Sequence, residues 1–267
     1  MNQKVLPEFS MDQIIEIVRG TRKIIMDAEA RAHVHRKGPA DFVTDVDFHV
    51  QEYLSGELAR LYPEIQFMGE EKDNRELDLD GALWILDPVD GTTNLIHQYR
   101  QSAVSLALCA GRQVVAGIIY NPYSEEVFSA RKGEGAFCCG QPMQVSRAET
   151  LAESLVEFGT SPYYREYADW TFHTAEKIFL HCQDIRRTGS AALDIAYVAA
   201  GRSEAFYEKR LSPWDYAAGL LLVQEAGGRV TDFGGKLQDP TRPSEVLATN
   251  GKVHGEMLRL LSENSRE

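Results

Sequence analysis

The chain has 267 residues, of which 43% are hydrophobic and 25% are charged, and its formal net charge is −12. These proportions are those of a globular protein, and the length allows one large domain or two of modest size. The acidic balance, with a pI of about 5.1, argues against a general binder of nucleic acid or acidic membranes, because such binders need clustered Lys and Arg.

The sequence shows no targeting signal, and its cysteines are those of a cytoplasmic protein. Residues 1–18 lack the apolar core and small-residue cleavage site of a signal peptide. No run approaches the roughly 18 apolar residues that a membrane span needs. The four cysteines are Cys109, Cys138, Cys139 and Cys182. They have no CxxC spacing, so we expect them to be reduced thiols. We therefore expect a cytoplasmic protein without a membrane segment.

Two helices are predicted at the start of the chain, over residues 11–30 and 44–61, because both carry apolar residues at helical spacing. Pro63 ends the second one. Between them, the polar Gly-Pro segment at 33–44 predicts a loop or hairpin. Short β-rich apolar segments separated by turns then predict the strands of a sheet, at 65–69, 83–87, 103–110 and 114–120.

The composition changes at the polar stretch 145–152, after which strands and helices alternate. Strands are expected at 154–159, 184–187, 204–209, 228–232 and 245–250, and helices at 167–181, after Gly189, from Trp214 and at the end of the chain. This pattern predicts a layered α/β (α+β) fold. We expect two halves, 1–147 and 148–267, that form one compact unit.

Acidic residues recur where a strand is expected to end or a helix to begin, which is the usual place of ligand sites in α/β proteins. They are Asp41 and Asp47, Glu70 and Glu71, Asp87 and Asp90, and Asp215. Oxygen ligands without His or Cys indicate a hard cation, Mg²⁺ before Zn²⁺. One Mg²⁺ takes one or two carboxylates, so this number favours two or more ions that share a carboxylate.

Taken singly, some of these residues have simpler explanations. Asp215 also suits a helix cap, and Glu70 with Glu71 also suits a surface turn. Asp87 and Asp90 are harder to explain in this way, because they directly end a strongly apolar segment.

Glycine turns follow two of the predicted strands. Gly91 would let the backbone approach a ligand closely, and a helix that begins after it would point N–H groups at an anion. Metal ions beside a helix N-terminus suit a phosphate ester. The segment 188–191 is a similar turn, although such turns are common. Arg186 and Arg187 precede it and suit either a substrate contact or a subunit contact.

Six segments together resemble the signatures of the inositol monophosphatase family, which are Mg²⁺-dependent, lithium-sensitive phosphatases. In chain order they are KGPADFVTDVD (37–47), MGEE (68–71), WILDPVDGTTNLIH (84–97), TGSAALDIAYVAAG (188–201), AFYEKRL (205–211) and SPWDYAAGLLLVQEAGG (212–228). The resemblance covers nearly the whole chain, and the SPWD turn looks bacterial. It implies a layered αβαβα sandwich.

The resemblance also implies a set of metal ligands. Glu70, Asp87 and the carbonyl of Val89 would hold one Mg²⁺, and Asp87, Asp90 and Asp215 would hold a second. Asp87 would bridge the two ions. A third ion would bind more weakly and would contact Glu70 through water.

The resemblance further implies roles in catalysis and substrate binding. Thr92 and Asp47 would take a proton from a metal-bound water. Glu70 is also expected to be a catalytic residue. Residues expected to contact the phosphate or the sugar-alcohol hydroxyls are Gly91, Thr92, Gly189, Ser190, Ala191 and Glu208. Lys37, on a loop near the site, and Glu71 are further candidates.

Glu208 favours inositol 1-phosphate as the substrate, because a carboxylate accepts hydrogen bonds from vicinal hydroxyls. Fructose 1,6-bisphosphate is also a polyol ester, and the family includes adenosine bisphosphate and histidinol phosphatases, so these other substrates stay open.

Some relatives bind RNA polymerase or other proteins, which leaves a binding function as a second class. The intact set of acidic residues favours the enzyme. Inhibition by Li⁺ and a homodimer are implied by the resemblance alone.

Overall fold

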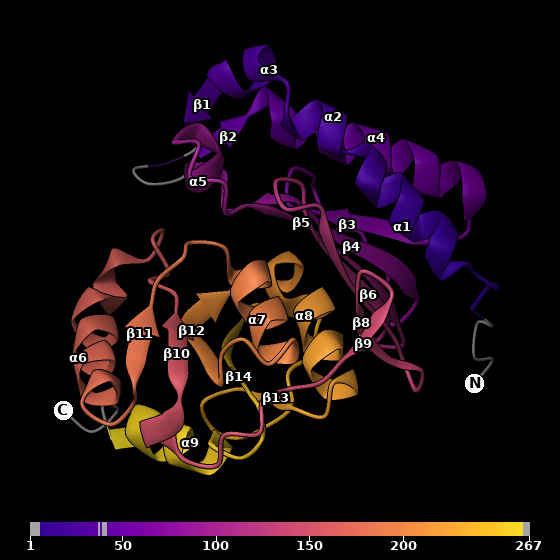
Figure 1. Ribbon diagram of the computed structural model, residues 1–267. Coiled ribbons are helices and arrows are strands. Elements are labelled where there is room, and N and C mark those ends of the chain that lie inside the picture. The colour runs from indigo at the N-terminus through magenta and orange to yellow at the C-terminus, as the bar shows by residue number, and fades with distance from the viewer. Residues whose placement is uncertain (1–5, 37, 39–41, 264–267) are drawn as a thin grey trace.

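The structure is a computed structural model that describes residues 6–36, 38 and 42–263. Helices and sheets alternate in five layers (Figure 1). Three clusters of buried apolar side chains fill the spaces between the layers. The αβαβα sandwich expected from the sequence is confirmed. No helix of the described residues is long and apolar enough to cross a membrane.

The first layer consists of helices near the N-terminus. They are α1 (Met11–Gly20), α2 (Arg22–Ile25), α3 (Ala28–Ala32) and α4 (Asp45–Leu61). The prediction of one helix over 11–30 is wrong, because two side chains compete for the backbone. The Thr21 hydroxyl donates to the carbonyl of Val18 at 2.6 Å, and the Asp27 carboxylate caps α3. Of the two expected alternatives, a loop or a hairpin, the structure has the hairpin: β1 (Val34–Arg36) pairs antiparallel with β2 (Phe42–Thr44).

The second layer is a seven-stranded sheet whose strands lie in chain order. They are β3 (Gln66–Gly69), β4 (Ala82–Asp90), β5 (Ala103–Ala110), β6 (Gln113–Asn121), β7 (Glu126–Arg131), β8 (Gly135–Cys138) and β9 (Gln141–Met143). Only β3 and β4 run parallel. Side chains of β4 and β5 are buried in apolar clusters on both faces of the sheet, which explains why these strands are almost continuously apolar rather than alternating.

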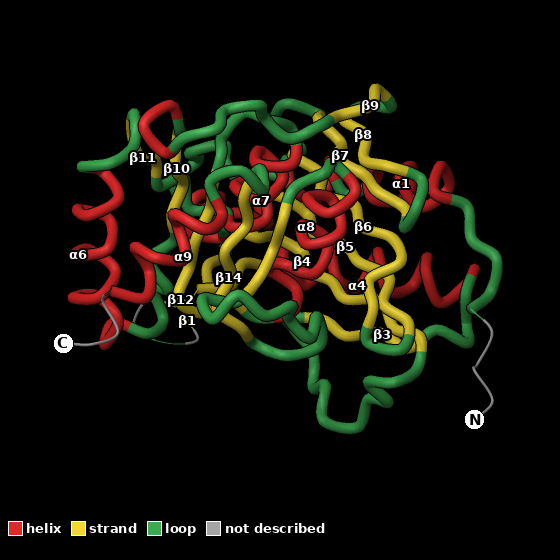
Figure 2. The backbone as a smooth tube through the Cα atoms, turned by 90° about the horizontal axis from the view of Figure 1, so that it is seen from below, coloured by secondary structure: helices red, strands yellow, loops and turns green. Residues whose placement is uncertain are grey.

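The third layer holds α7 (Ala191–Ala199) and α8 (Pro213–Glu225), which lie between the two sheets in both views (Figures 1 and 2). A helix that is apolar all round belongs inside a protein, and nine of the thirteen residues of α8 are buried. Close packing needs a glycine on the facing strand, because a Cβ on Gly117 would lie 2.7 Å from the carbonyl oxygen of Ala218.

The fourth layer is a five-stranded sheet, ordered β11 (Asp184–Arg186), β10 (Leu155–Phe158), β12 (Ala205–Leu211), β14 (Ser244–Thr249) and β13 (Arg229–Thr231). Its outer face is covered by α6 (Ala168–Phe179) and α9 (His254–Glu263). Short 3₁₀ turns lie at Leu151–Glu153 and Arg165–Tyr167. The two sheets use residues 66–143 and 155–249, and the expected division at 147/148 stays a prediction.

Candidate active site

Two carboxylates end strand β4. Asp87 pairs with Ser105 of β5 and Asp90 with Ala103, and the register shifts between the two pairs. A β-bulge of this kind re-aims side chains. Both aspartates line one cavity, although they are only 2% and 8% exposed.

A third carboxylate reaches this cavity from the start of α8. Asp215 is the last residue of a capping box, in which its Oδ2 accepts the N–H of Ser212 at 2.7 Å. Ser105 Oγ donates to the carbonyl of Trp214 at 2.9 Å, which ties α8 to the strand position opposite Asp87. Ligand oxygens of Asp87, Asp90 and Asp215 lie within 4.8 Å of one another. Asp215 therefore caps its helix and also faces the cluster.

Like charges and burial destabilise the ionised form of this cluster. Burial raises the pKa of Asp87 well above its usual range, and Glu70, Asp90 and Asp215 raise it further. The pKa of Asp215 is raised by burial and then by Asp90. Among the described residues, no basic side chain forms an ion pair with these three aspartates. Buried carboxylates of this kind need a cation or a proton, and an all-oxygen donor set fits Mg²⁺.

Asp90 is held by the turn that precedes α7. Ser190 Oγ donates to Asp90 Oδ2, and the N–H of Ala192 donates to the same oxygen at 2.9 Å. These bonds favour the charged form, but burial outweighs them and raises the pKa of Asp90 to about 6. The hydroxyl of Ser190, expected near substrate, is thus engaged by a candidate metal ligand. Gly189 and Ala191 line the cavity beside it.

Thr92 and Asp47 form the expected pair. Thr92 Oγ1 lies 3.1 Å from Asp47 Oδ1 and 3.1 Å from the carbonyl oxygen of Val89. The other oxygen of Asp47 accepts the N–H and hydroxyl of Thr44 at 2.8 and 2.7 Å, in the capping box of α4. Burial raises the pKa of Asp47 to about 6.

The two glycine turns pack against each other. Gly91 has a φ of 87°, which favours glycine, and it leads from β4 into α5 (Thr92–Ile96). A Cβ on Gly91 would lie 3.0 Å from the carbonyl oxygen of Gly189. Asn94 joins the turns, since its Nδ2 donates to the carbonyls of Gln101 and Thr188 at 2.6 and 3.0 Å.

Glu208 of β12 also lines the cavity. Its Oε1 accepts the N–H of Ser161 at 2.6 Å, and burial raises its pKa to about 7. Gly159 leaves the room that this carboxylate needs, because a Cβ there would lie 1.8 Å from Glu208 Oε2.

The remaining candidates are placed differently. Glu70 lines the cavity. Glu71 does not line it, and its backbone is held by Gln51, although its charge raises the pKa of Asp47. Lys37 lies outside the described residues. Arg187 lines the cavity, whereas Arg186 pairs with Asp184.

The catalytic cavity, as we call this space, has a volume of about 540 Å³. Its walls include residues that the sequence patterns did not single out, among them Tyr164, Arg165, Asp194 and Arg210. Arg210 has a sequence signal in retrospect, because it follows Glu208 by two residues in one strand and such residues share a face.

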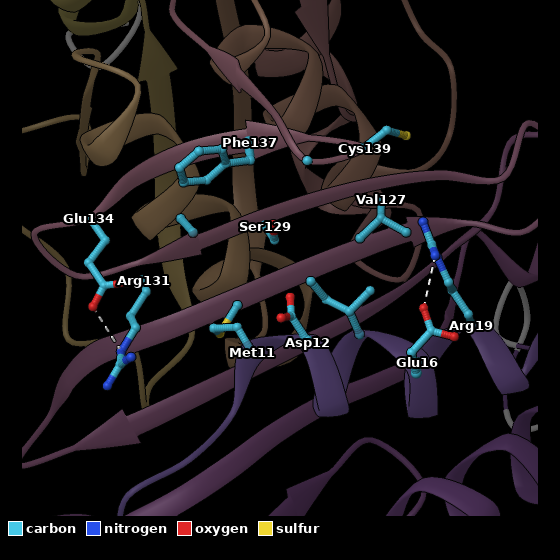
Figure 3. A pocket seen from close by; sticks show the side chains of 13 residues that line it. Met11, Asp12, Glu16, Arg19, Val127, Ser129, Arg131, Glu134, Phe137 and Cys139 are labelled. Atoms are coloured by element: carbon cyan, nitrogen blue, oxygen red, sulfur yellow. Dashed lines mark hydrogen bonds and ion pairs between the residues drawn. The ribbon is translucent and has the colours of Figure 1, made fainter.

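A second cavity, of about 500 Å³, lies between α1 and strands β7 and β8 (Figure 3). We call it the α1 groove. Four of its charged side chains form two local pairs: Arg19 lies 2.9 Å from Glu16, and Arg131 lies 3.3 Å from Glu134. None of the predicted site residues lines it.

Residues 8–266 match the model of the inositol monophosphatase family. The chain belongs to this family of phosphatases. It is 37% identical over 230 residues to an inositol-1-monophosphatase of Mesorhizobium japonicum, covering 86% of each chain. It is 40% identical over 223 residues to Nus factor SuhB of Escherichia coli, covering 84% of this chain and 83% of that one. A Thermotoga maritima fructose-1,6-bisphosphatase/inositol-1-monophosphatase is 35% identical over 255 residues, covering 95% and 96%.

Solved structures of the family have the same fold. A Thermotoga maritima IMPase superposes with a TM-score of 0.87 at 34% identity, covering 96% of this chain and 97% of that one. An IMPase/NADP phosphatase complexed with Mg²⁺ and phosphate superposes with a TM-score of 0.83 at 26% identity, covering 93% of both. A metal-dependent phosphatase fold is thus shared along almost the full described length.

Proposed function

We propose that the protein hydrolyses phosphate monoesters with Mg²⁺, and that inositol 1-phosphate is its main substrate. The observation that carries this proposal is the cluster of Asp87, Asp90 and the half-buried Asp215 beside the hydrogen-bonded pair of Thr92 and Asp47. The first group suits a hard cation, and the second suits a proton transfer. The products would be inositol and inorganic phosphate.

The residues that would hold Mg²⁺ are Glu70, Asp87, Asp90, Asp215 and the carbonyl of Val89. When bound, Mg²⁺ lowers the pKa of water and neutralises negative charge on the ester and its leaving group. The carboxylates supply the compensating charge and fix the positions, while Ser190 and Ser212 keep two of them oriented.

Thr92 and Asp47 would accept the proton of the attacking water. A carboxyl group with a pKa of about 6 is mostly ionised at neutral pH. The Thr92 hydroxyl can then donate to Asp47 and keep a lone pair for the water. Asp47 is only 1% exposed, so its carboxylate is shielded from bulk solvent, while the half-buried Thr92 can reach a water in the cavity.

Substrate binding would use several residues that line the catalytic cavity. The N–H groups of Gly91 and Thr92 would bind the phosphate, and Gly189, Ala191 and Glu208 would face the hydroxyls. Glu208 supports a polyol, since an ionised carboxylate accepts bonds from two neighbouring hydroxyls. The alternative is fructose 1,6-bisphosphate or a broader set of sugar phosphates, and the double name of the Thermotoga maritima relative supports it.

The test is release of inorganic phosphate from a panel of esters, with Mg²⁺ present or chelated. The panel holds inositol 1-phosphate, fructose 1,6-bisphosphate, 3′-phosphoadenosine 5′-phosphate and histidinol phosphate. Mg²⁺-dependent turnover with inositol 1-phosphate well ahead would support the proposal. Fructose bisphosphate ahead would keep the metal chemistry and replace the substrate, and no turnover of any ester by the folded protein would refute it.

A protein-binding role is the second candidate, because the name of the Escherichia coli relative is that of a Nus factor. A variant that loses phosphatase activity but keeps a protein partner would support this role. The homodimer, the cytoplasmic location and the inhibition by Li⁺ that the resemblance implies stay predictions.

A further inference from the structure

Two histidines and one aspartate form a polar group at the base of the β1–β2 hairpin. His33 and His35 are separated by one residue, and the backbone is extended at both. Side chains two residues apart in an extended chain lie on the same face. Asp45 lies across from them, because β1 pairs with β2 and the N–H of Asp45 donates to the carbonyl of His33 at 3.2 Å. Pairing of the hairpin thus brings together three side chains of metal-binding types.

Both imidazole rings direct a nitrogen at the same carboxylate. His33 Nδ1 lies 2.9 Å from Asp45 Oδ2, and His35 Nε2 lies 2.7 Å from Asp45 Oδ1. Zn²⁺ binds imidazole nitrogen and carboxylate oxygen at about 2.0–2.2 Å, so two ligand atoms at a right angle around it are about 3 Å apart. The observed N···O distances are close to this spacing, with protons in the place of a metal ion.

The fold holds these side chains in place. Asp45 is the first residue of α4, and Phe48 of the same helix contacts the His35 ring edge to face, with ring centres 6.3 Å apart. The bonds from His35 and then His33 lower the pKa of Asp45, which favours the ionised form that a metal ligand needs. The histidine side chains are 59% and 56% exposed, so an ion and its water ligands can reach them.

We propose that His33, His35 and Asp45 form a metal site on the hairpin, which binds a divalent transition-metal ion such as Zn²⁺. Imidazole nitrogen suits Zn²⁺, Cu²⁺ and Ni²⁺, whereas Mg²⁺ takes oxygen ligands. Three protein ligands would leave a coordination position for water. None of the three residues lines the catalytic cavity, so this hairpin site stands apart from the proposed phosphatase function. The two sites would select different ions, because the carboxylate cluster offers oxygen alone.

The test is calorimetric titration of Zn²⁺ into the full chain in excess Mg²⁺, which occupies oxygen-only sites. The variants are His33→Gln and His35→Gln. The matched control is His173→Gln, since His173 is also exposed but its Nδ1 lies 2.8 Å from the carbonyl oxygen of Asp169 in its own helix. We expect the wild-type protein and the control to bind Zn²⁺ equally. Each test variant should bind at least about tenfold more weakly, because loss of an outer partner of a metal ligand already costs about 10–100-fold.

X-ray absorption at the zinc edge gives a second readout. The wild-type protein in excess Mg²⁺ should show scattering from imidazole rings, and the double histidine variant should lose it. Equal Zn²⁺ affinity in the two test variants and the control would overturn the site. So would a Zn²⁺ environment of oxygen alone, or no binding of Zn²⁺ by the wild-type protein. Since the two histidines are substituted separately, misfolding of one variant leaves the other as the test.

Discussion

The catalytic cavity and the α1 groove are similar in size, at about 540 and 500 Å³, but their charges are arranged differently. In the α1 groove, two exposed carboxylates, Glu16 and Glu134, pair with the neighbouring guanidinium groups of Arg19 and Arg131 (Figure 3). In the catalytic cavity, three aspartates are gathered, two of them buried and one half-buried, without ion pairs among the described residues. Charge balance and burial, rather than volume, therefore distinguish a candidate active site from a surface depression.

The physical reason lies in solvation. Exposed ion pairs such as Glu16 with Arg19 contribute little to stability, because water already solvates both partners. Buried carboxylates lose hydration and repel one another, which raises the pKa of Asp87 and Asp215. A fold that keeps such a cluster must bind something positive there, while the groove needs no ligand.

The largest expected effect is on turnover by Asp90→Asn. The substitution keeps shape but removes a charge that a cation needs, so we expect kcat to fall about a thousandfold or more at saturating Mg²⁺. Phosphate release from inositol 1-phosphate measures it. Glu16→Gln in the α1 groove is the matched control and should keep full activity. Near-normal turnover by Asp90→Asn would contradict the two-metal assignment.

Removal of the Thr92 hydroxyl should have the next largest effect. Thr92→Val keeps the side-chain volume but breaks the bond to Asp47, and we expect kcat to fall about a hundredfold, as for loss of general base catalysis. Thr93→Val is the control, because Thr93 lines the same cavity without a role in the pair. Equal activities of the two variants would remove Thr92 and Asp47 from the mechanism.

Without metal, the folded protein should become less stable as the pH rises. The pKa values of Asp90 and Asp47 are raised to about 6 and those of Asp87 and Asp215 well above normal, whereas in the unfolded chain such groups titrate near 4. Between these values the folded protein binds more protons, so its stability falls as pH rises.

We therefore expect the melting temperature of the metal-free protein to fall by about 5 °C or more from pH 5 to pH 8. Adding Mg²⁺ should raise it, and more at pH 8 than at pH 5. Differential scanning calorimetry in a chelator and in Mg²⁺ tests this. A melting temperature that rises with pH in the chelator would show that the cluster does not control stability.

The smallest effects are expected in the α1 groove. Glu16→Gln and Glu134→Gln each remove one exposed ion pair, and the free energy of unfolding should change by less than about 0.5 kcal/mol. Denaturant titrations with and without Mg²⁺ measure this. A loss above about 2 kcal/mol, or a response to Mg²⁺ that differs from the wild type, would mean that the groove is not a solvated surface.

Local sequence was sufficient for much of the architecture. Apolar runs predicted both ends of β5, and Pro63 predicted where α4 ends. The Gly-Pro segment predicted a loop or hairpin, and the structure has the hairpin. It failed where side chains compete for the backbone, as Thr21 and Asp27 do in the segment expected to be one helix.

For the site, the sequence by itself determined which residue types are present: acidic side chains at strand and helix ends, and glycines where the backbone turns. Only the tertiary structure decided which of them meet. The bulge in β4 turns Asp87 and Asp90 into one cavity, and the bond from Ser105 to the start of α8 brings Asp215 to them. The tertiary structure also decides that Arg210 lines this cavity. The sequence specifies the chemistry of each side chain, but residues far apart in the chain come together only when the layers pack.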